Sequence, residues 1–338
     1  MPESHQTFTP FSRALIIAAA VVVVIAGMKQ AAPVLVPFLL SIFIAIMCLP
    51  PIKFMQDKGL PFFIALIVVI IGVVIVGILL GWLVGSSIDA FEQNLPEYRA
   101  RISAQWLQFI GVLQGFGIEI PQQFASETFN PGSAMNLVAR LLKGFGSVLA
   151  NSFLILLTVI FILTEAATFN RKLEDIGWSH DISDDFVGRL RRYMSIKTSM
   201  SLLTGTLVWL LCWSLGVDFA PLWGVIAFMF NYVPNIGSII AAVPAVLLAL
   251  VQLDPASAAI LAVGYVLINT GVGSVMEPRL MGSGLGLSTL VVFLSLVVWG
   301  WILGPVGMLL SVPLTVSVKL ALDANEETRW AGRLLGHA

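Results

Sequence analysis

Charged residues and cysteines are both scarce in this chain. Only 11% of its 338 residues are charged, while 58% are hydrophobic and the mean hydropathy is +0.96. Soluble domains carry about 25% charged residues, so this composition excludes an ordinary soluble protein. A net charge of -1 provides no positive surplus for a nucleic-acid partner. The two cysteines, Cys48 and Cys212, lie in apolar runs, which predicts packed free thiols rather than a disulfide.

The sequence also lacks the motifs of an enzyme or of a cofactor-binding protein. It has no GxxxxGK nucleotide loop, no Ser-His-Asp or Cys-His set, and no pair of intramembrane acids at protease spacing. The three histidines, His5, His180 and His337, fall in polar tails or loops without a second ligand at metal-site spacing. We therefore expect no enzymatic activity, no metal and no cofactor.

Long apolar runs dominate what is present. A membrane-spanning helix needs about 20 apolar residues, and this chain has room for about eight. The expected fold is an all-α, polytopic helical bundle of the inner membrane with broken or re-entrant helices. Met1–Lys29 superficially resembles a signal peptide, but no small-residue cleavage site follows, which favours an uncleaved first span. The expected spans are 13–28, 31–50, 61–85, 147–165, 198–216, 222–251, 256–276 and 288–318.

The distribution of basic residues predicts the orientation. With eight spans, twelve of the 18 Lys and Arg fall on the side of both termini and six fall on the other side. Basic residues accumulate in cytoplasmic loops, so both termini are expected in the cytoplasm.

Five segments follow from these spans. They are an N-terminal three-span segment (1–85), an extracytoplasmic amphipathic segment (86–146), a fourth span with a charged cytoplasmic segment (147–197), a C-terminal core with broken helices (198–322) and a cytoplasmic tail (323–338). Apolar residues recur every three or four positions from Ile88 to Leu113, which predicts a helix that continues the third span or lies at the interface. A connection containing Pro121 and Pro131-Gly132 is expected after it.

The heptapeptide Asn231-Tyr-Val-Pro-Asn-Ile-Gly237 interrupts the sixth apolar run. Pro234 has no N–H and displaces the carbonyl of Phe230. Irregular backbone survives at membrane depth only against protein or a watery cavity, and transporters build solute sites from such broken helices. Two interpretations stay open: a proline kink whose amides bond to neighbouring helices, or a solute path. The path would include Asn231, Tyr232, Pro234, Asn235 and Gly237, with Asn269 of the next span as a candidate addition.

A second polar stretch, Glu277-Pro278-Arg279, closes the seventh apolar run. An ion pair between Glu277 and Arg279 would act as a structural clamp or contact a polar solute. If Arg279 points elsewhere, Glu277 is a candidate proton carrier. The glycines that follow allow tight turns and expose amides to a solute; they are Gly282, Gly284 and Gly286.

Small residues also recur at helical spacing on two spans. Gly77, Gly81 and Gly85 form one GxxxGxxxG stripe, and Gly300 with Gly304 repeats the spacing on the last span. Such stripes allow close helix packing within or between subunits, so we expect a homo-oligomer.

Two long motifs carry a resemblance to a known family. FNYVPNIGSIIAAVPAVLLAL (230–250) and EPRLMGSGLGLSTLVVFLSLVVWGWILGPVGMLLSVPLT (277–315) resemble the autoinducer-2 exporter family, the PerM-like permeases. The resemblance covers the chain from about Lys29 to Leu322 and is strongest to the branch that contains the transporter of quorum-sensing signal 2. It implies an inner-membrane permease with about seven or eight spans, exporting a small uncharged polyhydroxylated signal, or exchanging sodium and protons in some branches. It supplies no established set of binding residues.

The sequence thus predicts a transporter that exports autoinducer-2 or a similar small polar metabolite. The lipid bilayer and a small polar solute are its expected partners. The alternative is a sodium/proton antiporter that uses Glu277, and a third interpretation is a structural role based on the glycine stripes.

Overall fold

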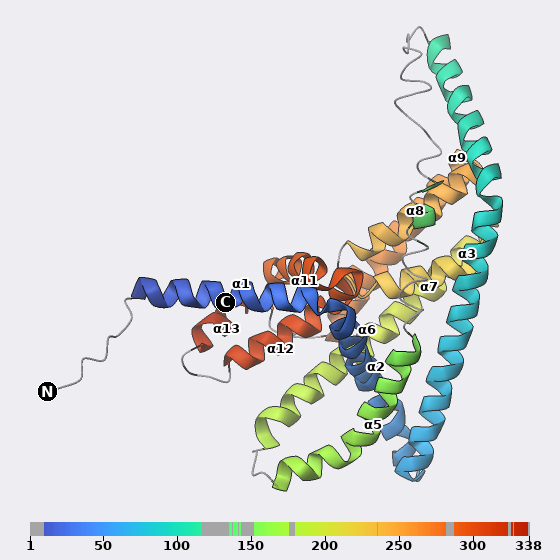
Figure 1. Cartoon of the computed structure of the whole chain (residues 1–338). Helices are drawn as coiled ribbons and strands as arrows, with labels where there is room; N and C mark the ends of the chain where they lie inside the picture. Colours follow the sequence, from blue (N-terminus) through green and yellow to red (C-terminus); the bar gives the residue numbers. More distant parts are fainter. Residues whose placement is uncertain are drawn as a thin grey trace, which may run out of the picture. The chain divides into compact units, whose positions relative to one another are not determined.

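The computed structural model describes residues 10–116, 135, 136, 138–140, 142, 152–175, 180–234, 236–281, 287–323, 326 and 328–336. Every regular element within these ranges is helical, as predicted (Figure 1). Asn235, Gly282, Gly284, Gly286 and the expected connection through Pro121 and Pro131 lie outside the described residues.

The helices form two compact units, one of residues 1–40 and 287–338 and one of residues 41–286. Helix α2 (Ala32–Asp57) runs through the boundary between them. The first unit contains α1 (Pro10–Gln30), α11 (Thr289–Leu309), α12 (Ser311–Asp323) and α13 (Arg329–Leu334). The second contains α3 (Phe62–Gly115), α5 (Ser152–Asp175), α6 (His180–Leu215), α7 (Ala220–Phe230), α8 (Gly237–Gln252), α9 (Pro255–Ile268), η2 (Asn269–Met276) and α10 (Glu277–Met281). The five-segment division given above stays a prediction.

Five helices of the described residues are long and apolar enough to cross a membrane. They cover Ala32–Asp57, Phe62–Gly115, Arg191–Leu215, Pro255–Leu280 and Leu290–Leu309. Shorter apolar helices cover Leu15–Gln30, Phe153–Glu165, Ala220–Phe230 and Gly237–Gln252. The apolar runs of the sequence are therefore helical, but several are shorter than one full crossing. Large apolar side chains on these helices are exposed, as contact with lipid tails requires, and include Ile71, Ile78, Trp82, Val263 and Leu267.

The third apolar run and the amphipathic segment form one continuous helix. Helix α3 has 54 residues, about 80 Å at 1.5 Å per residue, and so exceeds the hydrocarbon core of a bilayer, about 30 Å. Of the two alternatives for the amphipathic segment, continuation of the third span is confirmed. Phe91 and Tyr98, two of the recurring apolar residues of this segment, are buried and pack against each other with ring centroids 5.6 Å apart.

The last apolar run is interrupted at its Gly304-Pro305 pair. Gly304 has φ +70°, a conformation that favours glycine, and it kinks α11 just before Pro305. The kink returns the chain on itself, because a Cβ on Gly300 would lie 2.7 Å from Cγ of Met308. Trp299 Nε1 then donates to Thr315 Oγ1 of α12 at 3.0 Å. Within this unit the Lys29 ammonium of α1 lies 3.9 Å from the centre of the Trp301 ring.

Candidate functional site

The sixth apolar run is broken at the predicted heptapeptide. Helix α7 ends at Phe230 and α8 begins at Gly237, with turns between them. Gly237 is required for the close return of the chain, because a Cβ there would lie 1.9 Å from the carbonyl oxygen of Phe230. Val233 N donates to this same oxygen at 2.8 Å. The carbonyl that Pro234 was predicted to free is thus bonded within the break. Whether the run crosses the membrane as one broken span or as a re-entrant pair stays open.

One face of α6 carries the polar partners of this break. Lys197, Ser201 and Thr204 lie at positions i, i+4 and i+7, so they follow one another along one side of the helix. Asn231 Nδ2 donates to Ser201 Oγ at 2.9 Å in a buried contact. Tyr232 Oη donates to Thr198 Oγ1 at 2.9 Å, and its ring has edge contacts with Phe43 and Phe228. For Asn231 the structure thus contains the contact to a neighbouring helix that the kink interpretation requires.

A second discontinuity lies in the next apolar run. After α9 the chain forms the π-helix η2, which starts at Asn269 and ends just before Glu277. Stretches of π-helix are rare and occur often at functional sites. No sequence pattern predicted this element; its local signal is the Asn-Thr-Gly-Val-Gly stretch, which combines two polar residues and two glycines in an apolar run.

Glu277 pairs with Lys197 of α6, not with Arg279. The Lys197 Nζ and Glu277 Oε1 atoms lie 2.6 Å apart, and the two side chains are 6% and 14% exposed. Arg279 is exposed. The expected Glu277–Arg279 clamp is therefore wrong. Glu277 at the end of η2 faces α6, where a buried lysine 80 positions earlier in the chain neutralises its charge.

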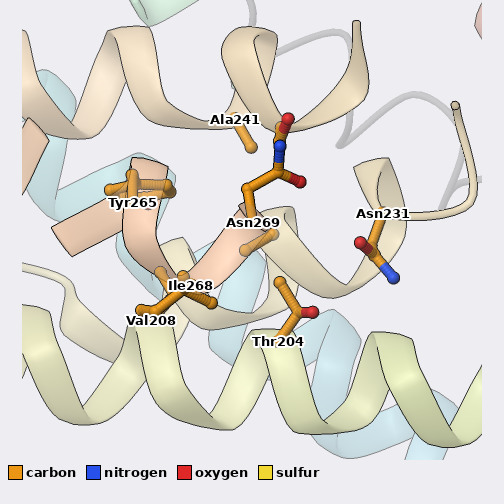
Figure 2. Close-up of a pocket in the computed structure, with 9 residues that line it drawn as sticks. Thr204, Val208, Asn231, Ala241, Tyr265, Ile268 and Asn269 are labelled. Carbon is orange, nitrogen blue, oxygen red and sulfur yellow. The ribbon is translucent and has the colours of Figure 1, made fainter. Parts of the chain in front are cut away.

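The two discontinuities and α6 enclose a small pocket. It is lined by five uncharged polar residues and four apolar ones: Thr204, Asn231, Ser238, Tyr265 and Asn269, with Val208, Ala227, Ala241 and Ile268. Figure 2 shows Thr204 and Val208 projecting from α6 toward Asn269, with Asn231 and Ala241 on other sides. Its free volume is about 10 Å³, close to the least that holds one water molecule.

Two hydroxyl groups in this pocket are buried without an ordinary partner. Thr204 and Tyr265 are each only 5% exposed, and among the described residues neither Thr204 Oγ1 nor Tyr265 Oη has a nitrogen or oxygen atom as a hydrogen-bond partner. The Tyr265 hydroxyl faces the thiol of Cys212, which is a weak hydrogen-bonding group. A buried hydroxyl without a partner costs free energy, so each is a group able to gain from a polar ligand.

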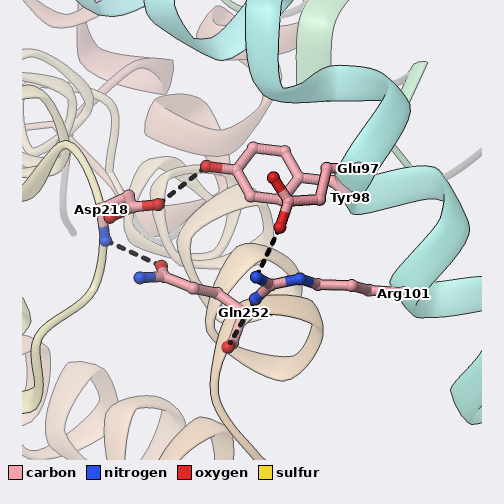
Figure 3. Close-up of polar contacts among 5 residues, drawn as sticks. All are labelled: Glu97, Tyr98, Arg101, Asp218 and Gln252. Atoms are coloured by element: carbon pink, nitrogen blue, oxygen red, sulfur yellow. Dashed lines mark hydrogen bonds and ion pairs between the residues drawn. The ribbon is translucent and has the colours of Figure 1, made fainter.

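The C-terminal half of α3 contacts the connections that flank these helices (Figure 3). Tyr98 Oη donates to Asp218 Oδ2 at 2.8 Å in the α6–α7 connection. Gln252 Oε1 accepts from the Asp218 backbone N–H at 2.9 Å, while its carbonyl oxygen accepts from Arg101 at 3.3 Å. Gln105 Nε2 donates to the carbonyl oxygen of Leu250 at 3.1 Å. A single helix thus connects the ends of α6, α7 and α8.

The other residues that the sequence predicted for the solute path or for helix packing lie as follows in the structure. Asn269 lines the pocket, and Pro234 and Gly237 lie in or next to the α7–α8 break. At Gly77, Gly81 and Gly85 an added Cβ would meet no atom of the described residues within 4 Å. The close glycine crossing of this unit occurs instead between α6 and α7, where a Cβ on Gly205 would lie 2.7 Å from the Gly224 carbonyl oxygen. Among the described residues no cluster of His, Cys, Asp and Glu has the arrangement of a metal site.

Comparison with known proteins decides the family. The model of the AI-2E family of transporters matches residues 16–327. The chain belongs to the AI-2E transporter family.

AI-2E relatives match along almost the whole chain. A Haemophilus influenzae protein, named only as a transport protein, is 41% identical over 334 residues, 96% of each chain. The AI-2 transport protein TqsA of Escherichia coli is 38% identical over 307 residues, 89% of each chain. The Escherichia coli protein YhhT, also named as a transport protein, is 32% identical over 322 residues, 94% of this chain and 92% of its own. This chain is therefore a multi-pass bacterial membrane transporter, as the sequence predicted.

Proposed function

We propose that this transporter exports the signal AI-2, or a similar small polar metabolite, across the bacterial inner membrane. The observation that carries the proposal is its 38% identity to TqsA across nine-tenths of both chains, since TqsA is named for AI-2 transport. A small, hydroxyl-rich, uncharged solute needs amide and hydroxyl groups rather than a charged site. The residues around the α7–α8 break and η2 have this character.

The proposed path follows the face of α6 past the two discontinuities. Asn231, Tyr232 and Asn269 provide polar groups within otherwise apolar runs. The only charges described there, Lys197 and Glu277, neutralise each other and so do not repel an uncharged solute. The names of the three relatives mention no exchange of sodium or protons.

Flux through proteoliposomes tests this function. Purified protein is reconstituted, and entry and exit of labelled AI-2 are measured with and without an imposed proton gradient. Movement of AI-2 down its own gradient, above protein-free vesicles and reduced in Asn231→Ala, is expected. Absence of AI-2 flux from the wild-type protein under every gradient would contradict the proposed substrate.

We also propose that the chain assembles as a homo-oligomer through the Gly77, Gly81 and Gly85 stripe. This stripe faces open space within one chain, although glycines at such spacing allow close helix contact. Gly81→Leu is expected to lower the mass of the detergent-solubilised assembly measured by light scattering. An unchanged mass in that variant would place the subunit contact elsewhere.

A further inference from the structure

The polar face of α6 forms a series of contacts with the two discontinuities. Lys197 binds Glu277, Thr198 binds Tyr232, and Ser201 binds Asn231, each through a contact between 2.6 and 2.9 Å. The next polar residue on this face, Thr204, follows Ser201 after one helical turn, yet its hydroxyl has no partner. The row of hydrogen-bonded contacts between α6 and the two discontinuities therefore ends where the pocket begins.

The opposite wall of the pocket also contains polar groups that lack ordinary hydrogen-bond partners. Tyr265 Oη is also buried, and among the described residues only the weakly bonding thiol of Cys212 faces it. One turn further along the same helix, Asn269 lines the pocket, and no hydrogen bond of its amide to another described residue is observed. Two buried hydroxyls, of Thr204 and Tyr265, and the half-buried amide of Asn269 thus line one small space without satisfying one another, and native proteins rarely leave buried hydroxyls without a partner.

We propose that Thr204, Tyr265 and Asn269 form the binding site for the transported solute, and that they select for its hydroxyl groups. This proposal rests on the proposed transport function but names a site that the family match does not assign. The ligand class is a small, uncharged molecule with several hydroxyls. Hydroxyl and amide groups donate and accept hydrogen bonds, while no charged side chain lines the pocket. Val208, Ala241 and Ile268 contact the carbon skeleton.

The pocket is too small to hold the solute in this conformation. A free volume of about 10 Å³ holds no molecule of four or five carbons, so the pocket must widen when the solute enters. Tyr265, Ile268 and Asn269 lie at the junction of α9 with η2, where the hydrogen-bond pattern of the helix changes. This wall is the one that we expect to move, because its backbone already departs from a regular α-helix.

Removal of the two hydroxyls with almost no change of shape tests the site. Thr204→Val and Tyr265→Phe each remove one polar group. Thr206→Val is the matched control, because Thr206 lies on the exposed side of α6 and its hydroxyl donates to the carbonyl of Leu202. Binding of radiolabelled AI-2 and radiolabelled erythritol is measured on purified protein, with unlabelled 1,4-butanediol, which has erythritol's carbon chain and two fewer hydroxyls, as a competitor.

The expected result is a selective loss of affinity. Each pocket variant weakens binding of the probe about five-fold, the cost of one hydrogen bond, and reduces the preference for erythritol over 1,4-butanediol. Thr206→Val binds like the wild type. Thr204→Val also melts no lower than the wild type, because its buried hydroxyl has no partner to lose, whereas Tyr265→Phe loses at most the weak contact with the Cys212 thiol.

The outcomes separate this proposal from the proposed function. AI-2 flux and binding that are unchanged in both pocket variants would overturn the site and leave AI-2 export standing. Erythritol binding that depends on Thr204 and Tyr265, without any AI-2 flux, would support the site and reject AI-2 as the substrate. Failure of the wild type to bind either probe would overturn the ligand class, and a lower melting temperature of Thr204→Val would show that its hydroxyl has a structural partner.

Discussion

The α7–α8 break depends on single residues whose size matters more than their chemistry. Gly237 has no side chain, and this allows the start of α8 to approach the Phe230 carbonyl. A proline and two asparagines suffice to predict that the helix breaks. The short distance across the break was not predictable, because it depends on how the chain returns after the proline.

Gly237→Ala is expected to destabilise the protein by about 1–3 kcal/mol or more, because its Cβ would overlap the Phe230 carbonyl oxygen. The measurement is thermal unfolding of purified protein in detergent. Gly72→Ala is the control, since a Cβ there meets nothing within 4 Å and alanine favours a helix. Equal melting temperatures for the two variants would show that the break relaxes around a methyl group.

The Lys197–Glu277 pair is the other contact in which single residues decide the structure. Lys197→Met or Glu277→Gln alone is expected to cost about 3–5 kcal/mol, because each leaves one buried charge without its partner. The double variant is expected to be more stable than either single variant. Chemical unfolding of the four proteins forms a double-mutant cycle, and additive losses would mean that the two charges do not depend on each other.

At the scale of elements, the sequence predicted helices and their interruptions well and the contacts between them poorly. Hydrophobic periodicity from Ile88 to Leu113 was sufficient to predict a helix there, with continuation of the third span as one of two alternatives. Gly304 and Pro305 coincide with the break in α11. Neither η2 nor the partner of Glu277 was predictable. Lys197 lies 80 positions from Glu277 in sequence, next to a basic cluster that suggests only membrane topology.

The start of α9 contains a carboxylate outside the spans, Asp254, whose pKa is clearly shifted. Hydrogen bonds from the Ser257 hydroxyl and backbone, and from the Ala256 N–H, lower the pKa of the Asp254 carboxyl below its usual value. Because the folded-state pKa is the lower one, the charged cap stabilises the fold above about pH 4, the unfolded value, and this contribution is lost as the pH falls through the folded-state pKa.

Asp254→Ala is therefore expected to lower the melting temperature at neutral pH, and the difference from the wild type should shrink at acidic pH. Melting curves of both proteins between pH 3 and 7 measure this difference in melting temperature. Asp57→Ala, which removes a carboxylate at the exposed end of α2, controls for general effects of charge. A difference that grows with acidity would contradict the assigned role of the cap.

The contacts of α3 form the element-scale link between the connections around the site. Tyr98→Phe combined with Gln105→Ala is expected to speed hydrogen exchange of backbone amides in the C-terminal half of α3, because both variants remove a bond to those connections. Gln108→Ala, an exposed position on the same stretch, provides the control. Unchanged exchange in the double variant would assign the docking of this half to the Phe91 and Tyr98 rings alone.

At the scale of the whole molecule, the composition already identified a polytopic membrane protein. The number of complete crossings was less predictable, because apolar runs of similar composition become one helix of 54 residues in one case and two short helices in another. The predicted orientation, with both termini in the cytoplasm, places the C-terminal half of α3 outside.

Cysteine labelling tests this orientation. Ser103→Cys on exposed α3 is expected to react with a membrane-impermeant maleimide on intact spheroplasts, and Gln56→Cys only after permeabilisation. The native thiols of Cys48 and Cys212 are 5% and 0% exposed, so the background is low. Labelling of Gln56→Cys in intact spheroplasts would reverse the orientation.

The π-helix η2 also determines the direction in which the side chains that follow it project from the helix axis. Each π-type hydrogen bond spans one residue more than an α-type bond, so the stretch from Asn269 to Met276 sets the angle at which Glu277 leaves the helix axis. Loss of one residue in this stretch would rotate Glu277 by about 100° and turn it away from Lys197. The length of this stretch, and not only its chemistry, therefore determines which side chain faces α6.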